Sequence, residues 1–431
     1  MEARTDQGAD QPADRPRTEV PPMSELRILT PGLGAVSTTL MAGVMLARKG
    51  LARPIGALSE YGDLDGKPIN DLLAPLDQIS FGAWDPYDES AYEVAERSGV
   101  LSAEHLAAVA DELMEIVPKS AVFDPTWVQA LSGAPHVKTG DSHMDLVEQI
   151  IEDIESYRAD GQRVVMVWCG STEAYHHPTA VHQSLTDFEL GLKNNDSAIA
   201  PSQLYGYAAI RAGVPFANGA PNVTVDIPAL EQMAEQYGVP IAGKDFKTGQ
   251  TLMKTVIAPG LKARRLGVRG WFSTNILGNR DGLVLDHPDN FRSKEITKLG
   301  VLDSLLKPEE HPDLYGDLSH EVRINYYPPA GDNKEGWDNI DIVGWMDYPM
   351  QIKVNFLCRD SILAAPIVLD LARFLDLAGS AGNSGIQDWL GFYFKSPHPV
   401  EGRSVEHDLF VQERVLMDEI RALSGRLAPV D

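Results

Sequence analysis

The clearest indication of the fold lies in the segment Leu26-Arg-Ile-Leu-Thr-Pro-Gly32-Leu-Gly34-Ala35-Val36-Ser37-Thr38-Thr-Leu-Met-Ala-Gly43. A short apolar strand runs into a glycine turn, and a helix with apolar spacing follows. A dinucleotide site requires this order, because glycines let the backbone approach a pyrophosphate and the helix N-terminus faces it. The third glycine of the usual fingerprint is absent, and Ser37 stands in its place. The stretch therefore predicts a Rossmann-type fold from a partial match.

A carboxylate that could bind the ribose of a nucleotide follows each of two candidate strands. The run 54–58 ends close to Glu60, and the run 78–84 ends at Asp85. In dinucleotide-binding folds an acidic side chain accepts hydrogen bonds from the ribose hydroxyls. Either Glu60 or Asp85 could serve in this role.

Further strands and helices alternate through the first half of the chain. Residues 163–168 (Arg-Val-Val-Met-Val-Trp) form an apolar run that is typical of a buried parallel strand. Ser171 and Thr172 follow it, at the end of the strand where open α/β sheets hold ligands. Helices are expected at 143–157, 188–191 and 201–212. The alternation indicates an α/β fold with a parallel sheet.

The pattern changes after Thr251. Strands are expected at 268–272, 323–327 and 351–358. In the last of these every second residue is apolar, which indicates a sheet that is covered on one face only. Such a mixed or antiparallel sheet could pack against another subunit. A long apolar helix is expected to begin near Ser361.

These patterns predict an α/β protein with two folded domains and a tail. We expect a disordered tail over 1–23 and a Rossmann-type nucleotide-binding domain over 24–251, completed by 363–431. An inserted α/β domain over 252–362, with a mixed or antiparallel sheet, is expected to carry catalytic residues and to form oligomer contacts.

The composition limits the partners of the protein. The 37 Lys and Arg residues against 62 Asp and Glu residues give a net charge of −25, which repels nucleic acid and anionic membranes. The longest apolar stretches end well short of a membrane span, and the first 23 residues lack the apolar core of a signal peptide. Two distant cysteines indicate neither a disulfide nor a zinc site. We therefore expect a cytoplasmic protein.

Four lysines in motif-like surroundings stand out in this acidic chain: Lys294, Lys298, Lys334 and Lys395. Lys294 and Lys298 are four residues apart and would share a helical face, which is ordinarily a solvated surface. Lys334 follows a Gly-Asp-Asn turn, and Lys395 follows an apolar run that should draw it into a pocket. Only the four together predict a site for a small anionic substrate, such as a phosphorylated one.

Five sequence blocks of the second half carry a resemblance to a known family. They are Lys-Thr-Gly-Gln-Thr (247–251), Leu-Gly-Asn-Arg-Asp-Gly (277–282), Arg-Ser-Lys-Glu-Ile-Thr-Lys (292–298), Gly-Asp-Asn-Lys (331–334) and Arg-Asp-Ser-Ile-Leu-Ala-Ala-Pro (359–366). In order and composition the chain resembles the myo-inositol-phosphate synthases from about Leu26 to Pro397. The short glycine turn resembles the bacterial branch of that family.

The resemblance implies a redox-neutral cyclisation. The family oxidises C5 of open-chain glucose 6-phosphate with NAD, removes a proton from C6, closes the ring onto C1 and returns the hydride, giving inositol 3-phosphate. Enolisation and aldol closure build negative charge on oxygen, which ordered ammonium groups stabilise. Clustered cations also depress one another's pKa, so a neutral lysine becomes available as a base. The family further implies a homotetramer.

The resemblance also implies a role for each matching residue. The implied catalytic residues are Lys294, Lys298, Lys334, Lys395, Asp245, Asp281 and Asn275, with Lys298 beside the hydroxyl that is oxidised at C5. The implied NAD contacts are Gly32, Gly34, Ala35, Val36, Ser37, Thr38, Asp85, Ser171, Thr172, Asp332, Asp360 and Ser361. The implied substrate contacts are Thr248, Lys294, Lys334 and Lys395. The resemblance thus favours Asp85 over Glu60 as the ribose acceptor, and it implies no metal.

Two alternatives stay open. The same chemistry on fructose 6-phosphate would give a five-membered cyclitol phosphate for carbocyclic natural products. The lysines do not separate the two substrates, because both carry a 6-phosphate and a carbonyl. A protein of another class would bind NAD and sugar phosphates as an inactive regulator. The presence of all four lysines with their carboxylates argues against that class.

Overall fold

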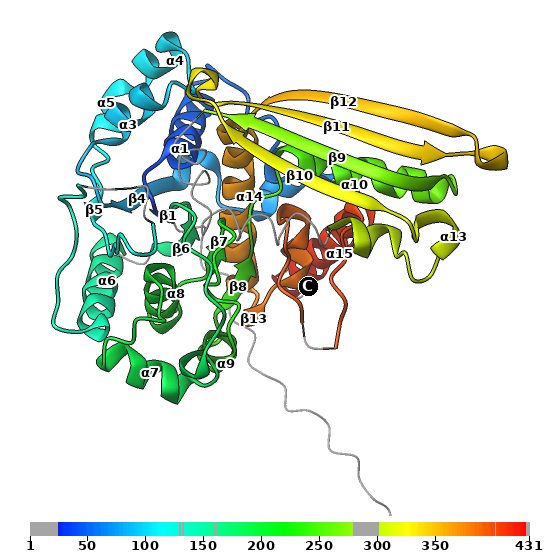
Figure 1. The fold of residues 1–431 in the computed structure, drawn as a ribbon. Coiled ribbons are helices and arrows are strands. Elements are labelled where there is room, and N and C mark those ends of the chain that lie inside the picture. The colour runs from blue at the N-terminus through cyan, green and yellow to red at the C-terminus, as the bar shows by residue number, and fades with distance from the viewer. Residues whose placement is uncertain are drawn as a thin grey trace, which may run out of the picture.

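The structure is a computed structural model that describes residues 25–128, 131, 133–158, 162–278, 301–400 and 402–427. Two large sheets organise these residues (Figure 1). The predicted tail lies outside them, as do Lys294, Lys298 and Asp281.

The first sheet is parallel and has seven strands in the order β13-β8-β7-β6-β1-β4-β5. Its strands are β1 (Leu26–Pro31), β4 (Ile79–Asp85), β5 (Lys119–Ser120), β6 (Arg163–Trp168), β7 (Phe216–Asn218), β8 (Pro240–Gly243) and β13 (Gly385–Ile386). The chain first builds outward from β1 through β4 to β5, and then returns to place β6 on the other side of β1. This reversal is the position where ligands bind in doubly wound folds.

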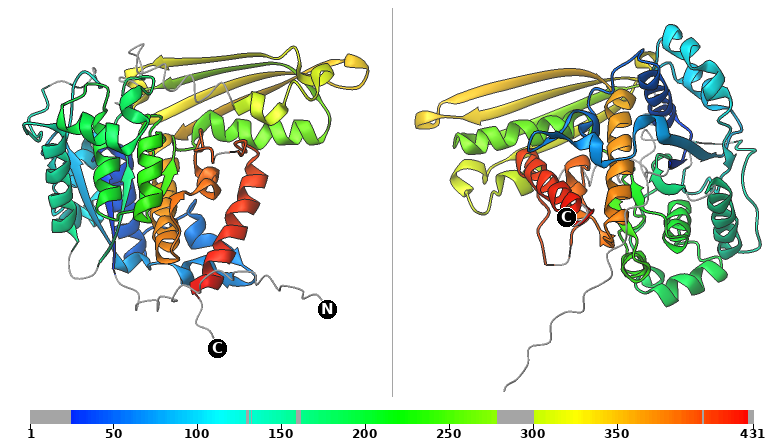
Figure 2. Two further views of the ribbon diagram at one scale, coloured as in Figure 1. Left: turned by 90° about the horizontal axis from the view of Figure 1, so that it is seen from below. Right: turned by 180° about the vertical axis from the view of Figure 1, so that it is seen from behind.

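Helices cover both faces of this sheet. They are α1 (Ala35–Arg48), α2 (Leu58–Tyr61), α3 (Ala91–Ser98), α4 (Ala103–Ala108), α5 (Ala110–Met114), α6 (His143–Tyr157), α7 (Leu185–Lys193), α8 (Pro201–Arg211), α9 (Pro228–Tyr237), α14 (Asp360–Ser380) and α15 (Leu409–Leu427). Ile28 and Val165 belong to the core on the side of α1 and α14, which lie side by side (Figure 2). Leu29 and Met166, the next residues along their strands, pack on the opposite side with α6, α8 and α9. Among the described helices, none combines the length and apolar character needed to cross a membrane.

The second sheet is mixed, with the order β10-β9-β11-β12. Its strands are β9 (Gly267–Leu277), β10 (Ser319–Tyr326), β11 (Asn333–Val343) and β12 (Pro349–Arg359). Only the pair β9 and β10 is parallel. Helices α10 (Gly249–Ala263) and α13 (Pro312–Tyr315) pack on one face together with residues 301–306. In β12 the odd-numbered residues from 351 to 357 are exposed, as the alternation predicted.

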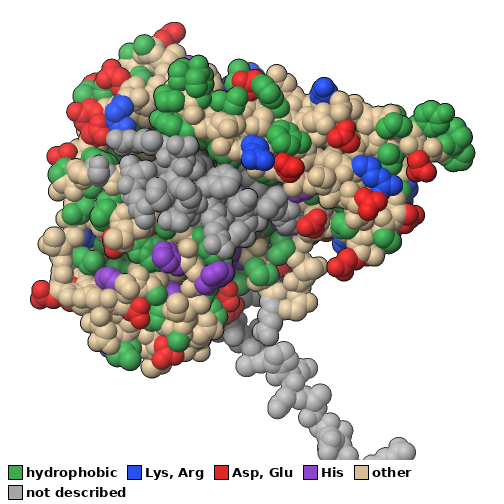
Figure 3. Space-filling model, in the orientation of Figure 1, with side chains coloured by type: hydrophobic (Ala, Val, Ile, Leu, Met, Phe, Trp, Pro, Cys, Tyr) green, Lys and Arg blue, Asp and Glu red, His purple; other side chains and the backbone are tan. Residues whose placement is uncertain are grey.

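The sheet projects from the body, and apolar side chains gather at its far end (Figure 3). The turn between β11 and β12 contains Trp345 and Met346, which are 87% and 70% exposed. The fold therefore has the predicted class, a Rossmann-type sheet with a second, mixed sheet.

The predicted strand at 54–58 is wrong. Gly56 has a φ of +96°, which breaks an extended run, and the helix α2 begins at Leu58. The Asp370 carboxylate accepts hydrogen bonds from Leu58 N at 2.8 Å and Ser59 N at 3.0 Å, so it caps this helix. The apolar residues of this run therefore lie beside the N-terminus of α2. The strand that pairs with β1 on this side of the sheet is β4.

Candidate cofactor and substrate site

The glycine turn between β1 and α1 leaves the backbone accessible to a ligand. Gly32 has a φ of +94°, and a Cβ at this position would lie 2.5 Å from Gly170 Cα. A Cβ at Gly34 would meet nothing within 4 Å, and Gly34, the N-cap residue of α1, has no side chain that could cap the helix. The N–H groups of the first helical turn thus stay available to an anion.

Ser37 and Thr38 support this turn from behind. Ser37 Oγ donates to Gly32 O at 2.6 Å, and Thr38 Oγ1 donates to Gly34 O at 3.1 Å. Both side chains are buried, and neither lines the cavity described below. Ser37 thus fixes the position of the turn where the usual fingerprint has its third glycine.

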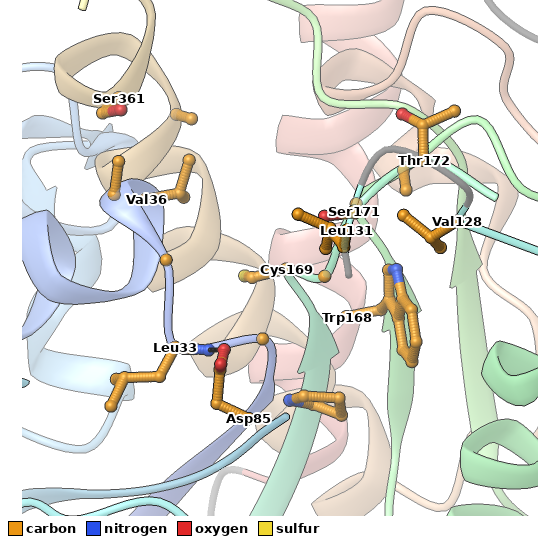
Figure 4. A pocket seen from close by; sticks show the side chains of 18 of the residues that line it. Leu33, Val36, Asp85, Val128, Leu131, Trp168, Cys169, Ser171, Thr172 and Ser361 are labelled. Atoms are coloured by element: carbon orange, nitrogen blue, oxygen red, sulfur yellow. Dashed lines mark hydrogen bonds between the residues drawn. The ribbon is translucent and has the colours of Figure 1, made fainter. Parts of the chain in front are cut away.

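The carboxylate of Asp85 is held against the same turn from the end of β4 (Figure 4). Its Oδ2 accepts a hydrogen bond from Leu33 N at 2.8 Å, and its Oδ1 accepts one from Tyr87 N at 3.1 Å. Glu60 is instead engaged with the buried guanidinium of Arg373 at 2.6 Å and does not line the cavity.

A cavity of about 580 Å³ opens at the carboxyl ends of β1, β4 and β6. It brings together predicted residues from distant parts of the chain: Gly32, Gly34, Ala35, Val36, Asp85, Ser171, Thr172, Asp245, Thr248, Asp332, Asp360, Ser361 and Lys395. The backbone at Ser171 and Thr172 follows β6 along one wall (Figure 4). A pocket of 300–1,000 Å³ with few polar groups on apolar walls is typical of cofactor sites.

Two lysine–carboxylate pairs lie at the cavity, which is lined by Lys395 and both carboxylates but not by Lys334. Lys395 Nζ lies 2.8 Å from Asp245 Oδ1, and Lys334 Nζ lies 3.1 Å from Asp360 Oδ2. Lys395 N also donates to Asp245 O at 2.7 Å, which fixes the first pair through the backbone. Lys334 pairs in register with Cys358 of β12, and Asp360 follows two residues later at the start of α14.

The N-terminus of α10 lies beside Lys334. Thr248 precedes this helix, and its side chain makes no capping hydrogen bond with the first turn. Gly249 has a φ of +57°, and a Cβ there would lie 3.6 Å from Lys334 Nζ. Uncapped helix N–H groups next to an ammonium form a site suited to a phosphate.

Asn275 lies outside the cavity lining, on the face of the second sheet that also carries Lys334. Its Nδ2 donates to Gln250 Oε1. Within the described ranges, His, Cys, Asp and Glu side chains form no group of three or more that could hold a metal ion.

The sequence interpretation missed several buried polar groups. Glu173 lines the cavity and accepts a hydrogen bond from Ser202 N at 2.8 Å. Burial raises the pKa of its carboxyl to about 7. Burial lowers the pKa of Lys247 to about 7 and that of Lys254 to about 8. The apolar lining from Trp168 was also missed. A strand residue of this kind carries no signal that separates a cavity wall from a core.

The structure thus defines a Rossmann-type α/β protein in which a glycine turn and the Lys395–Asp245 pair line one cavity. The chain belongs to the myo-inositol-1-phosphate synthase family, whose model matches residues 26–421. This confirms the resemblance seen in the sequence, and with it the expected class of enzyme, the inositol-3-phosphate synthase type.

Individual relatives agree with this assignment. Inositol-3-phosphate synthase 1 of Bacteroides thetaiotaomicron is 51% identical over 420 residues, which cover 95% of this chain and 98% of that protein. A probable inositol 3-phosphate synthase isozyme of Arabidopsis thaliana is 32% identical, covering 96% of this chain and 87% of that protein. The crystal structure of inositol-3-phosphate synthase from Caenorhabditis elegans has the same fold, with a TM-score of 0.87 at 24% identity over 94% of this chain and 87% of that one.

Proposed function

We propose that this protein converts D-glucose 6-phosphate into 1D-myo-inositol 3-phosphate, with NAD as a cofactor that is regenerated in each cycle. One observation carries the proposal. A single cavity is lined by the glycine turn and Asp85, and also by Asp360 and by Lys395 with its partner Asp245. A hydride acceptor and a sugar phosphate would therefore meet in one cavity.

The residues of the turn fit a dinucleotide. The open backbone at Gly34 and the uncapped start of α1 would receive the pyrophosphate, and the Asp85 carboxylate would receive a ribose hydroxyl. When bound, NAD would take the hydride from C5 and return it to the cyclised product. Ser171 and Thr172 would border the nicotinamide half, because they follow β6 across the switch point from Asp85.

The lysines would contact different parts of the sugar phosphate. Thr248, the first N–H groups of α10 and Lys334 would hold the 6-phosphate. Lys395 would donate to the oxygen that becomes negative when C6 loses its proton, and Asp245 would orient that ammonium. We assign Lys298 to the C5 hydroxyl and Lys294 to the phosphate and the developing oxyanions. Asp281 would orient a lysine or the nicotinamide region. These three residues lie outside the described ranges.

The balance of the reaction explains why the cofactor would stay bound. C5 loses a hydride and its hydroxyl proton, C6 loses a proton, and the C6–C1 bond forms. The C1 oxygen then takes up a proton, and the C5 carbonyl takes back a hydride and a proton. Because substrate and product are isomers, no net oxidation occurs, and no step requires NADH to leave.

Product analysis tests the proposal and separates the alternatives. The purified protein with NAD is incubated separately with glucose 6-phosphate and with fructose 6-phosphate, and products are identified by ¹H and ³¹P NMR. We expect a six-membered cyclitol phosphate from glucose 6-phosphate. A five-membered product from fructose 6-phosphate would establish the first alternative, and binding of both ligands without turnover would establish the inactive regulator.

We also infer that the protein is a homotetramer joined through the open face of the second sheet. Support comes from side chains on the face opposite α10. Phe272, Trp337 and Leu357 are 42%, 50% and 64% exposed there. Light scattering coupled to size-exclusion chromatography gives the mass directly, and a monomer at micromolar concentration would contradict the inference.

A further inference from the structure

Gln250 links the start of α10 to the central strands of the second sheet. It is the second residue of the helix, and its side chain is 4% exposed. Its Nε2 donates to Thr274 O and to Trp337 O, both at 2.9 Å. These two residues face each other across β9 and β11. Gly336 leaves room for the contact, since a Cβ there would lie 2.9 Å from Gln250 Cγ.

The backbone carbonyls of Thr274 and Trp337 determine how the side-chain amide of Gln250 is oriented. A carbonyl oxygen only accepts hydrogen bonds, so Nε2 has to face Thr274 O and Trp337 O. A third acceptor, Asp338 Oδ2, lies 3.4 Å from the same nitrogen. Asp338 is itself fixed, because its Oδ1 accepts from Trp271 Nε1 at 2.8 Å and from Ser273 Oγ at 2.6 Å.

The orientation of the Gln250 amide in turn determines the orientation of the Asn275 side-chain amide. Because Nε2 of Gln250 faces the carbonyls, its Oε1 faces Asn275, and an amide oxygen can only accept. Asn275 therefore presents Nδ2 to Gln250, and a second acceptor, Arg323 O, lies 3.5 Å from that nitrogen. Amide orientations are usually assigned from a network that could be reversed as a whole. Here the network starts at backbone carbonyls, which have no reversed form.

We propose that Gln250 is a positioning residue that fixes Asn275 with its amide oxygen turned toward the substrate. Asn275 would then accept a hydrogen bond from a hydroxyl of the sugar or from an ammonium, and would not donate one. Asn275 is paired with Gly336 and shares the sheet face of Lys334, which places it next to the inferred phosphate site. The inference rests on the proposed function and adds to it a substrate contact for Asn275, which the family resemblance implies as a catalytic residue.

A double-mutant cycle tests this role through kcat/KM for glucose 6-phosphate. Gln250→Met keeps the length of the side chain but removes both polar ends, and Asn275→Ala removes the group that is positioned. We expect Gln250→Met to lower kcat/KM by about 10- to 100-fold, because misplacement of a contact group costs that much. In the Asn275→Ala background the same change should lower it by less than about threefold. Losses that multiply in the double variant would overturn the inference.

Gln250→Glu separates positioning from stability. A glutamate keeps an oxygen toward Asn275 Nδ2, so Asn275 stays oriented, but it turns a carboxylate toward the carbonyls of Thr274 and Trp337. We expect Gln250→Glu to melt below Gln250→Met and yet to be the more active of the two. Activity that follows the melting temperature instead would show a merely structural role. A wild-type protein without cyclisation activity would refute the proposed function itself, which is a distinct outcome.

Discussion

Lys395 and Asp245 form an ion pair at 2.8 Å between side chains that are only 5% and 4% exposed, although 150 residues separate them in the chain. The backbone holds the same two segments together, since Lys244 N donates to Ser396 O at 2.9 Å and Ser396 N donates to Lys244 O at 3.1 Å. The C-terminal segment thereby delivers an ammonium to the loop that precedes α10.

Removal of this ammonium should affect stability and activity separately. Lys395→Met should destabilise the fold by about 3 kcal/mol, because a buried ion pair loses one partner, and should lower kcat about 10²–10³-fold. The double variant Lys395→Met/Asp245→Asn should recover most of the stability but none of the activity. Urea denaturation and steady-state kinetics check the two arms. Recovery of activity along with stability would mean that the pair is only structural.

Asp85→Ala should weaken NAD binding. The variant loses an acceptor for the ribose and the contact from Leu33 N that orders the turn, so we expect a loss of about 1.5–3 kcal/mol, or roughly 10- to 100-fold in Kd. Isothermal titration calorimetry measures the affinity.

Glu60→Gln is the control for the ribose assignment. It removes the charge beside Arg373 and should lower the melting temperature without changing the Kd for NAD. If Glu60→Gln weakened NAD binding and Asp85→Ala did not, the ribose assignment would be reversed.

Lys334→Met should raise the KM for glucose 6-phosphate more than it lowers kcat. Loss of a charged hydrogen bond to the phosphate costs about 1.5–3 kcal/mol, which corresponds to roughly 10- to 100-fold in binding. Lys307→Met is the matched control, because Lys307 is 51% exposed and pairs only with Glu310 among the described residues. An unchanged KM in Lys334→Met would show that the substrate phosphate does not bind at the start of α10.

His398 should make stability fall in mild acid. Burial lowers the pKa of this imidazole from 6.5 to about 4, so between these values the unfolded chain binds a proton that the folded one does not. Its contribution is therefore complete above pH 6.5 and should decline by about 3 kcal/mol as the pH falls to 4. Urea denaturation at several pH values should show a shallower decline for His398→Asn than for wild type. The exposed His177→Asn should decline like wild type.

Local sequence signals predicted the regular elements well. The helix α6 and the strand β6 have the predicted bounds, because a capping box of Ser142 and Asp145 starts the helix and the apolar run of the strand is buried. The run 54–58 was wrongly predicted to be a strand, because the carboxylate that caps α2 comes from Asp370, more than 300 residues away. No local pattern contains such a partner.

The site was predictable only in part for the same reason. The glycine turn followed from the sequence pattern, whereas the choice of Asp85 over Glu60 came from the family resemblance. The pairing of Lys395 with Asp245 was not predicted, because 150 residues separate the two side chains in the chain. The support that Gln250 gives Asn275 had no sequence signal at all, because it depends on carbonyl groups of two strands in a folded sheet.

In the proposed reaction, C5 gives up its hydride and receives the same hydride back. Conversion of D-[5-²H]glucose 6-phosphate with unlabelled NAD tests this most directly, with the product examined by ²H NMR and the released cofactor by mass spectrometry. We expect a cyclitol phosphate that keeps the deuterium on the carbon derived from C5, with no net formation of NADH. Deuterium in free NADH or in water, at the level of product formed, would contradict it.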